Sequence, residues 1–298
     1  MTGPAARTDA QAKINLHLRV FGKNPSGYHS IQTLFHRIDF SDCVTVRVGE
    51  AKRRLDVQGA DIGAPESNLA YRAAVDYANS AGWPRGFTIE LEKRVPIGGG
   101  LGGGSADAAA VLRLLNFLAD RPLPSEDLMA IASGLGADVP FLLTDHVMAM
   151  AWGRGDRMRG LPALPQRQVL LVVPGIPVST AEAYAWLDED RRGEPAFVPP
   201  EPASETNGAD PFGSWDEIAE VSSNDFITSV VARHPELGEL LAELRHTKPL
   251  LASMTGSGST LFGIYEEAPA LADTLVHKAA DVIRTRTSTS VVQPIRLG

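Results

Sequence analysis

The chain has 298 residues, of which 44% are hydrophobic, and its formal net charge is −8 from 28 Lys+Arg and 36 Asp+Glu. This length and composition predict a globular protein of two compact domains and exclude an intrinsically disordered chain. The acidic balance argues against a general nucleic-acid binder, which needs a basic surface, but it leaves room for a local site that binds a small anion.

Neither a membrane segment nor a secretory leader is expected. No apolar run approaches the ~20 residues of a membrane helix, and residues 1–12 lack the apolar core of a signal peptide. The single cysteine, Cys43, allows no internal disulfide and no cysteine-based zinc site. We therefore expect a cytoplasmic protein with neither a nucleic-acid nor a membrane partner.

Apolar periodicity along the chain predicts alternating strands and helices. The expected strands cover residues 13–20, 43–48, 87–91, 169–173, 261–265 and 289–294. The expected helices cover residues 69–81, 105–118, 125–134, 217–231, 235–244 and 268–284, with Ser125 as an N-cap and Gly134 as the stop of the third. Residues 24–27 predict a turn, and the Pro/Glu-rich stretch 188–213 predicts a surface insertion. This mixture predicts an α+β (mixed α/β) protein in two parts.

The most informative stretch is a glycine run, in which six of the seven residues from Gly98 to Gly104 are glycine. Glycine inside a helix or strand costs about 0.5–1 kcal/mol relative to alanine, so such a run indicates a need for bare backbone. An anion held by several N–H groups meets that need, and the N-terminus of the following helix adds free donors and partial positive charge. Strand, glycine loop and helix together predict a phosphate-binding loop.

Three common nucleotide-binding loops fit this glycine run poorly. A Walker A loop requires lysine where this chain has Gly104, and a dinucleotide-binding G-x-G-x-x-G matches almost any run this rich in glycine. A protein-kinase loop requires later H-R-D and D-F-G triplets, and neither occurs. A flexible linker is the structural alternative, although linkers seldom lie between an amphipathic strand and a strong helix.

The pattern that remains is P-x-x-x-G-L-G-x-x-x-A, from Pro96 to Ala106, and it resembles the phosphate-binding loop of the GHMP kinases. Segments 12–16, 27–29, 135–140 and 255–259 extend the resemblance over nearly the full chain. Within this superfamily the chain is similar to enzymes that use ATP and Mg²⁺ to phosphorylate the 2-hydroxyl of a methylerythritol carrying a cytidine diphosphate group, in non-mevalonate isoprenoid biosynthesis. The resemblance implies a two-domain GHMP kinase fold, with an ATP-binding domain over 1–165, a second domain over 166–298 and an active-site cleft between them.

The resemblance also assigns roles to individual residues. Asp138 is implied to be the catalytic base that orients the acceptor hydroxyl, and Lys13 its electrostatic partner; taken alone, Asp138 also fits a turn and Lys13 a solvent-facing strand edge. The implied ATP-binding residues are Pro96, Ile97, Gly98, Gly99, Gly100, Leu101, Gly102, Gly103, Gly104, Ser105 and Ala106, with Asn68 and Lys93 near the adenine. Taken alone, Asn68 also fits the N-cap of the helix over 69–81.

The implied substrate-binding residues are Asn15, Tyr28, His29, Thr180 and Tyr184, and the turn over 255–259 is implied to close the cleft over the phosphates. In this assignment His29 hydrogen-bonds the cytosine, Tyr28 stacks on it and Tyr184 lies on its opposite face. Many GHMP loops carry two hydroxyl residues before the alanine, and Gly104 replaces one of them here. Ser105 is then the loop's candidate magnesium ligand.

Two other functions stay open. The first is a GHMP kinase acting on homoserine or a mevalonate, although neither has a base to account for the segment over 27–29. The second is a nucleotide-binding protein without catalysis, which the presence of both Lys13 and Asp138 disfavours.

Overall fold

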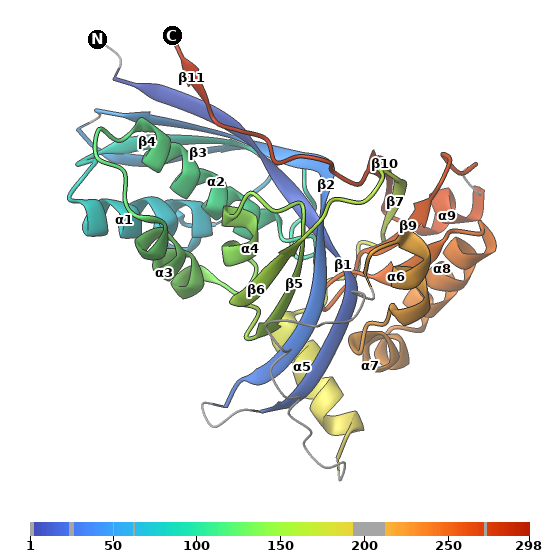
Figure 1. The fold of residues 1–298 in the computed structure, drawn as a ribbon. Coiled ribbons are helices and arrows are strands. Elements are labelled where there is room, and N and C mark those ends of the chain that lie inside the picture. The colour runs from blue at the N-terminus through green and yellow to red at the C-terminus, as the bar shows by residue number, and fades with distance from the viewer. Residues whose placement is uncertain (1–2, 24–26, 50, 62, 193–211, 271–272) are drawn as a thin grey trace.

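The computed structural model describes residues 3–298 except 24–26, 50, 62, 193–211 and 271–272 (Figure 1). The strands are β1 (Ala5–Lys23), β2 (His29–Val48), β3 (Arg53–Gln58), β4 (Phe87–Glu92), β5 (Met148–Gly153), β6 (Arg157–Leu161), β7 (Gln168–Val173), β8 (Leu251–Met254), β9 (Leu261–Tyr265), β10 (Asp281–Arg286) and β11 (Ile295–Leu297). The α-helices are α1 (Leu69–Ala81), α2 (Gly103–Leu118), α3 (Ser125–Leu135), α4 (Val139–Leu143), α5 (Thr180–Asp190), α6 (Trp215–Val221), α7 (Phe226–Arg233), α8 (Pro235–His246) and α9 (Asp273–Lys278), and Pro65–Ser67 forms a 3₁₀ turn. This mixture confirms the predicted fold class. No helix in the described ranges is both long enough and apolar enough to span a membrane.

The first sheet is built on two long antiparallel strands, β1 and β2, of 19 and 20 residues. Its order is β11-β1-β2-β4-β3. β4 pairs with one half of β2 and β5 with the other half, so two ribbons diverge from the same strand. Helices α1 to α4 pack beside this sheet, and the alanines of α2 are buried in a shared core with Phe35, Ile89 and Phe141. Small side chains on α2 let the helix lie close to the sheet.

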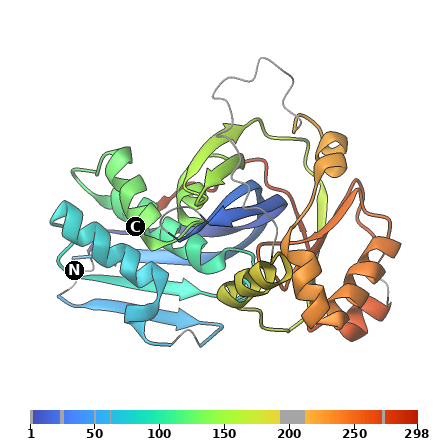
Figure 2. The same cartoon turned by 90° about the horizontal axis from the view of Figure 1, so that it is seen from below.

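The second sheet has the order β10-β7-β9-β8 and is fully antiparallel. Helices α7, α8 and α9 lie on the side of the molecule opposite α1 and α3, and α5 lies between the two groups (Figure 2). β1 reaches into this second part, because Leu18 and Val20 are buried in the same cluster as Leu170 and Leu241. The long strands therefore share core with both parts of the molecule.

The chain's last strand returns to the first sheet. β11 pairs with the start of β1, with Ala5 opposite Leu297, and the two chain ends lie near each other (Figure 1). The strands of the second sheet lie between residues 168 and 286, and β11, which follows them, belongs to the first sheet. The proposed domain limits of 1–165 and 166–298 stay predictions.

Most of the predicted elements are confirmed. The strands over 13–20, 43–48, 87–91, 169–173 and 261–265 lie within β1, β2, β4, β7 and β9. The helices over 69–81 and 235–244 are α1 and most of α8, and the helix predicted from Ser105 begins two residues earlier, at Gly103.

Three element predictions near the C-terminus are wrong. The helix over 217–231 is interrupted between α6 and α7, where Asn224 bridges to Leu18 and its amide donates to the carbonyl of Met254. The helix over 268–284 ends at Lys278, and β10 follows because the edge of β7 offers a full antiparallel ladder. Residues 289–294 form no strand, and the last strand lies just beyond them.

Two local predictions also need correction. Ser125 is the first residue of α3 after Pro124 at the N-cap, and the helix passes Gly134 to end at Leu135. The predicted insertion begins too early, because α5 continues through Asp190. The rest of that stretch, over 193–211, and residues 24–26 of the predicted turn lie outside the described residues.

Candidate active site

A continuous groove follows the line between the two parts of the molecule. A central cavity of about 260 Å³ contains Lys13 and Asp138. An outer cavity of about 480 Å³ contains Tyr28 and His29, and a third of about 560 Å³ runs along the glycine loop. Thr180, at the start of α5, lines all three. The groove therefore joins the glycine loop to the aromatic residues predicted for the base.

Lys13 and Asp138 meet in the central cavity, as their predicted pairing requires. The ammonium Nζ of Lys13 lies 3.2 Å from Asp138 Oδ2, and it donates to Asn15 Oδ1 at 2.7 Å and to the Gly100 carbonyl at 2.9 Å. Only 3% of the lysine side chain is exposed, against 29% of the aspartate. Three acceptors thus fix the ammonium, and the carboxylate keeps an open side toward the cavity.

Gly102 makes this arrangement possible. Its φ is +71°, and a Cβ there would lie 3.0 Å from Lys13 Cε and 3.1 Å from Lys13 Cγ. A side chain at this position would press on the lysine and strain the backbone. Glycine at 102 therefore lets the loop pass directly over Lys13 before α2 begins.

The carbonyl groups of the glycine loop are bonded to the protein. The Gly99 carbonyl accepts from the Thr260 amide at 3.2 Å, and the Leu101 carbonyl accepts from the Lys13 amide at 3.0 Å. The Gly100 carbonyl accepts from Lys13 Nζ and from the Thr255 hydroxyl at 3.0 Å. Since C=O and N–H point in opposite directions in a trans peptide, the N–H groups of residues 100–102 point away from these partners. Together with the N-terminus of α2 they can hold an anionic phosphate.

The turn between β8 and β9 packs directly on the loop. A Cβ on Gly100 would lie 2.1 Å from the Thr255 carbonyl oxygen, and a Cβ on Gly256 would lie 3.2 Å from Gly100. Ser257 and Gly258 line the loop cavity. The turn predicted over 255–259 thus forms one wall of the groove.

Beneath the loop, three charged residues form what we call the buried clasp: Asp42, Lys93 and Asp107. Lys93 Nζ donates to Asp42 and, at 2.8 Å, to Asp107 Oδ2. Asp42 Oδ1 also accepts from the amides of Arg94 and Val95 at 2.5 and 2.8 Å. The exposed fractions of the three side chains are 5%, 0% and 2% for Lys93, Asp42 and Asp107. The clasp therefore ties the strand that enters the loop to the helix that leaves it.

The clasp has an excess of carboxylate, and this affects its protonation. Burial raises the pKa of Asp107 to about 7, against the opposing effect of Lys93. Burial disfavours the lysine's charge, but Asp107 and Asp42 outweigh it and raise the pKa of Lys93. Among the described residues, Asp107 Oδ1 has no hydrogen-bond partner. Lys93 was predicted to lie near the adenine. The structure places it in the lining of the loop cavity, with its ammonium directed to the two carboxylates.

Asn68 lies between the 3₁₀ turn and α1. Its side-chain oxygen accepts from the amides of Ala70 and Tyr71 at 2.8 and 3.3 Å, which confirms its N-cap role for α1. It also lines the loop cavity, together with Pro96 and Ile97. The exposed Ile97 side chain stands at the cavity's rim.

In the outer cavity His29 and Tyr184 stack on each other. Their ring centroids are 4.7 Å apart with planes at 18°, and Phe226 meets Tyr184 edge-on at 4.9 Å. Burial, with the charge of Asp138, raises the pKa of Tyr184 to about 12. Tyr28 lies under the Arg154 guanidinium, 4.1 Å from its ring centroid. The two tyrosines thus have partners of their own, and a stacked base must use their remaining faces.

The last two predicted substrate-binding residues, Asn15 and Thr180, differ in how many hydrogen bonds they already make to the protein. Asn15 lines the central cavity, but its oxygen accepts from Lys13 and Gly256 while its amide donates to Thr33. Thr180 shares one hydrogen bond, of 3.0 Å, with Ser257.

Magnesium would have few protein ligands in this groove. The described residues contain no group of three metal-binding His, Cys, Asp or Glu side chains. Ser105, in the first turn of α2, lines both the central and the loop cavity beside Asp138. Hydroxyl and carboxylate oxygens fit Mg²⁺, which keeps waters and phosphate oxygens as its other ligands.

Comparison with known proteins identifies the family. Family models match residues 68–146 (GHMP kinases N terminal domain) and residues 205–280 (GHMP kinases C terminal). A 4-diphosphocytidyl-2-C-methyl-D-erythritol kinase from Citrifermentans bemidjiense is 36% identical over 279 residues, covering 93% of this chain and 94% of the relative. The chain belongs to this family of GHMP kinases.

Other relatives agree. The Salinibacter ruber protein of the same name is 38% identical over 88% of this chain and 90% of its own length. A crystal structure of 4-(cytidine 5'-diphospho)-2C-methyl-D-erythritol kinase superposes with a TM-score of 0.72 at 33% identity, covering 94% of this chain and 98% of that one. Homoserine kinase from Cytophaga hutchinsonii, at 16% identity and a TM-score of 0.67, shares the fold. The chain is thus a small-molecule kinase, and membership of the family implies the use of ATP.

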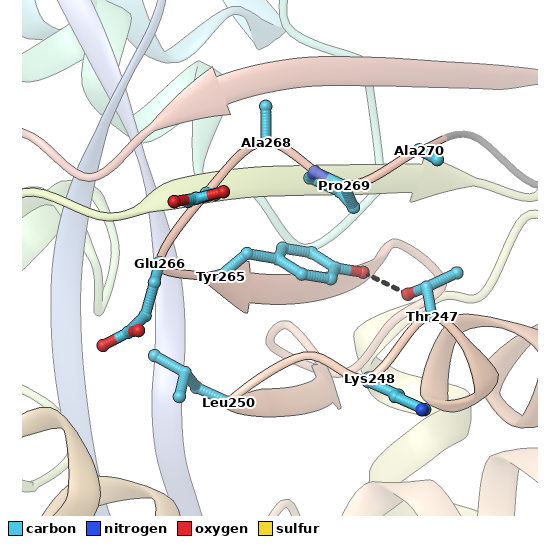
Figure 3. A pocket seen from close by; sticks show the side chains of 9 residues that line it. Thr247, Lys248, Leu250, Tyr265, Glu266, Ala268, Pro269 and Ala270 are labelled. Carbon is cyan, nitrogen blue, oxygen red and sulfur yellow. Dashed lines mark hydrogen bonds between the residues drawn. The ribbon is translucent and has the colours of Figure 1, made fainter.

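This GHMP kinase also has a larger hollow, of about 590 Å³, at the edge of its second sheet (Figure 3). Tyr265 and Thr247 share a 2.6 Å hydrogen bond there, and the charged side chains of Lys248, Glu266 and Glu267 line it. Its lining includes neither the Lys13–Asp138 pair nor any part of the glycine loop, so we locate the chemistry in the groove.

The buried clasp partners Asp42 and Asp107, the outer-cavity residue Arg154 and the α5 residue Asp188 were missed by sequence reasoning. Asp107 carried a signal, as the one carboxylate within the alanine-rich helix α2. Asp42 and Arg154 carried none.

Proposed function

We propose that this kinase transfers the γ-phosphoryl group of ATP to the 2-hydroxyl of 4-diphosphocytidyl-2-C-methyl-D-erythritol, with Mg²⁺, giving the 2-phosphate and ADP. The observation that carries the proposal is the Lys13–Asp138 pair, which lies between the glycine-loop cavity and the aromatic outer cavity. A phosphoryl donor on one side and a base-bearing acceptor on the other would meet at this pair. The substrate names of the relatives support the choice of acceptor.

In the proposed mechanism Asp138 orients the acceptor hydroxyl and takes its proton as the O–P bond forms. Its partial exposure to the cavity leaves the carboxylate accessible, and the Lys13 ammonium lies 3.2 Å from its Oδ2. The fixed Lys13 ammonium would also stabilise negative charge on the transferring phosphoryl group, without having to reorganise during the reaction.

The glycine loop supplies the other half of the site. Its N–H groups and the N-terminus of α2 would hold the phosphates of ATP. Ser105 would hold Mg²⁺ together with ATP oxygens and waters, and the ion would neutralise charge on the phosphates when bound. Lys93 and Asn68 would form part of the wall of the nucleotide site, and the clasp would keep the two ends of the loop together.

The outer cavity would take the cytidine end of the substrate. His29, Tyr28 and Tyr184 offer a hydrogen-bonding edge and aromatic faces, and stacking on such faces contributes about 1–3 kcal/mol per base in other proteins. Asn15 and Thr180 line the central cavity and would contact the part of the substrate between the base and the reacting hydroxyl. The cytoplasmic location and the absence of nucleic-acid and membrane partners stay predictions.

An ADP-release assay with ATP and Mg²⁺ tests the proposal, with the cytidine substrate, homoserine and mevalonate as acceptors. We expect turnover with the cytidine substrate only, and competitive inhibition by cytidine diphosphate. Turnover with homoserine or mevalonate instead would keep the kinase and refute the cytidine assignment.

The role of Asp138 has its own test. Asp138→Asn is expected to lower kcat by at least about 100-fold, because the amide accepts no proton, while the Kd for ATP changes little. Asp145→Asn is the matched control, since Asp145 is exposed and pairs with Arg113 outside the groove. Near-normal turnover by the Asp138 variant would remove it from the mechanism.

A further inference from the structure

A carboxylate that sequence reasoning placed in a surface insertion lies in the outer cavity. Asp188 Oδ1 is 2.7 Å from His29 Nε2, and its other oxygen is 2.7 Å from Lys23 Nζ. Asp188 is on α5, which runs beside the ends of β1 and β2 that carry the two partners (Figure 1). One side chain therefore connects three elements at the mouth of the groove.

Helix α5 contacts the His29 ring both on its face and at its edge. Tyr184 and Asp188 are four residues apart, and therefore lie on one face of α5. Tyr184 stacks on the face of the His29 ring, while Asp188 contacts the ring edge. Only 10% of the histidine side chain is exposed. The ring's position and its orientation are both fixed before any substrate arrives.

This contact determines which ring nitrogen carries hydrogen. An ionised carboxylate accepts hydrogen bonds and donates none, so Nε2 must be the donor to Asp188. Burial works against the charge of Asp188, but hydrogen bonds from Lys23 and His29 outweigh it and lower its pKa. In a neutral imidazole whose Nε2 carries the hydrogen, Nδ1 is an acceptor.

Resting on the proposed function, we infer that Asp188 is a positioning residue that makes the site select cytosine over uracil. Cytosine has an amino donor at C4, and uracil has a carbonyl acceptor at the same place. A base that binds against Nδ1 of His29 would meet an acceptor there, which matches cytosine and leaves two acceptors facing each other with uracil. A mismatch of this kind in a buried site discriminates strongly between analogues.

The first measurement is the tautomer of His29 in the free protein, from the ¹⁵N chemical shifts of its ring. We expect hydrogen on Nε2 in the wild type and a mixture of tautomers in Asp188→Asn, whose amide can donate or accept. Hydrogen on Nδ1 in the wild type would overturn the inference. This measurement needs no ligand and tests the effect of the Asp188 contact on the ring; the effect on base selection is tested separately, by the second measurement.

The second measurement is the ratio of Kd values for uridine diphosphate and cytidine diphosphate by calorimetry. We expect the wild type to prefer cytidine diphosphate and Asp188→Asn to lose at least about tenfold of that preference, as one hydrogen bond to a charge-assisted pair implies. Asp190→Asn is the matched control, because Asp190 lies on the same helix and pairs at 2.6 Å with Arg233, away from the cavity. It should keep the preference.

The outcomes separate the two hypotheses. Binding of cytidine diphosphate with no preference over uridine diphosphate, or an unchanged preference in Asp188→Asn, would overturn the inference and leave the proposed function standing. No binding of cytidine diphosphate, with no turnover of the cytidine substrate, would refute the proposed function and the base selection with it.

Discussion

Replacing Lys93 by methionine tests the buried clasp. Methionine has a straight chain that fills a similar space without a charge. The substitution leaves Asp42 with the two amide donors of residues 94 and 95, but it removes the ammonium that donates to Asp107 Oδ2. Breaking a buried ion pair from one side usually costs about 3–5 kcal/mol, because the remaining charge loses its compensation. Since all three side chains are at most 5% exposed, we expect a loss of stability in that range.

Urea denaturation followed by circular dichroism measures the loss, with Lys278→Met as the matched control. Lys278 donates to Glu239 at 2.9 Å, nearly the clasp's 2.8 Å, but both residues of this pair are exposed. The control should show no measurable change in its midpoint. Adding Asp107→Asn to Lys93→Met should recover part of the stability above pH 7, because it removes a buried carboxyl group that burial already disfavours ionising and that has lost its ammonium partner.

The clasp is also expected to affect the affinity of the protein for ATP. With the loop's two ends untied, the Kd for ATP should rise in Lys93→Met, whereas kcat at saturating ATP should change less. A cost below about 1 kcal/mol, the range of exposed pairs, would refute the reasoning from burial. A stability loss with unchanged ATP affinity would refute the link between clasp and loop.

Two further predictions concern the glycine loop and acid stability. Gly98 and Gly100 both have positive φ, of 72° and 78°, but of these two only Gly100 has a neighbour, the Thr255 carbonyl, in the way of an added Cβ. Gly98→Ala should therefore lower the free energy of unfolding by about 1–2 kcal/mol, and Gly100→Ala should lower it clearly more. Equal losses in urea titrations would contradict the packing of the loop on the turn. Burial lowers the pKa of His36 from 6.5 to about 4, outweighing its hydrogen bond to the Arg37 carbonyl, so the folded state binds fewer protons than the unfolded state between these values. The stabilisation is complete above pH 6.5 and is lost as the pH falls toward 4, by at most about 1.4 kcal/mol per pH unit; His36→Asn should flatten this dependence, and parallel stability curves for wild type and variant would show that His36 is not the group responsible.

The parts of the site that could be predicted lie in short segments with strong backbone demands. The density of glycine was itself the signal for the loop, although the contacts that require Gly102 and Gly100 are made with the distant residues Lys13 and Thr255. The pairing of Lys13 with Asp138 was implied by the resemblance to the GHMP kinases, and the two side chains lie 3.2 Å apart. Strands with a clear apolar pattern could also be predicted, and the one over 261–265 matches β9 residue for residue.

The parts that were missed depend on contacts between distant segments. Asp42 is 51 residues from Lys93 in sequence, and nothing in its neighbourhood indicates a buried charge. Asp188 was obscured by the composition of the residues that follow it. The helix predicted over 268–284 was wrong because a short apolar run suits a strand equally well, and the open edge of β7 decided between them.

The return of β11 to the first sheet has a consequence for how the protein is made. The N-terminal half of the chain is synthesised first, yet at Ala5, Ala6 and Arg7 the second neighbouring strand of β1 is formed only by residues 295–297. Until those last residues emerge, one margin of β1 keeps its peptide groups unpaired there. A product that stops before residue 295 would carry a permanently open strand edge, the kind of surface on which chains aggregate. Pairing of β11 with β1 therefore protects the strand that is synthesised first.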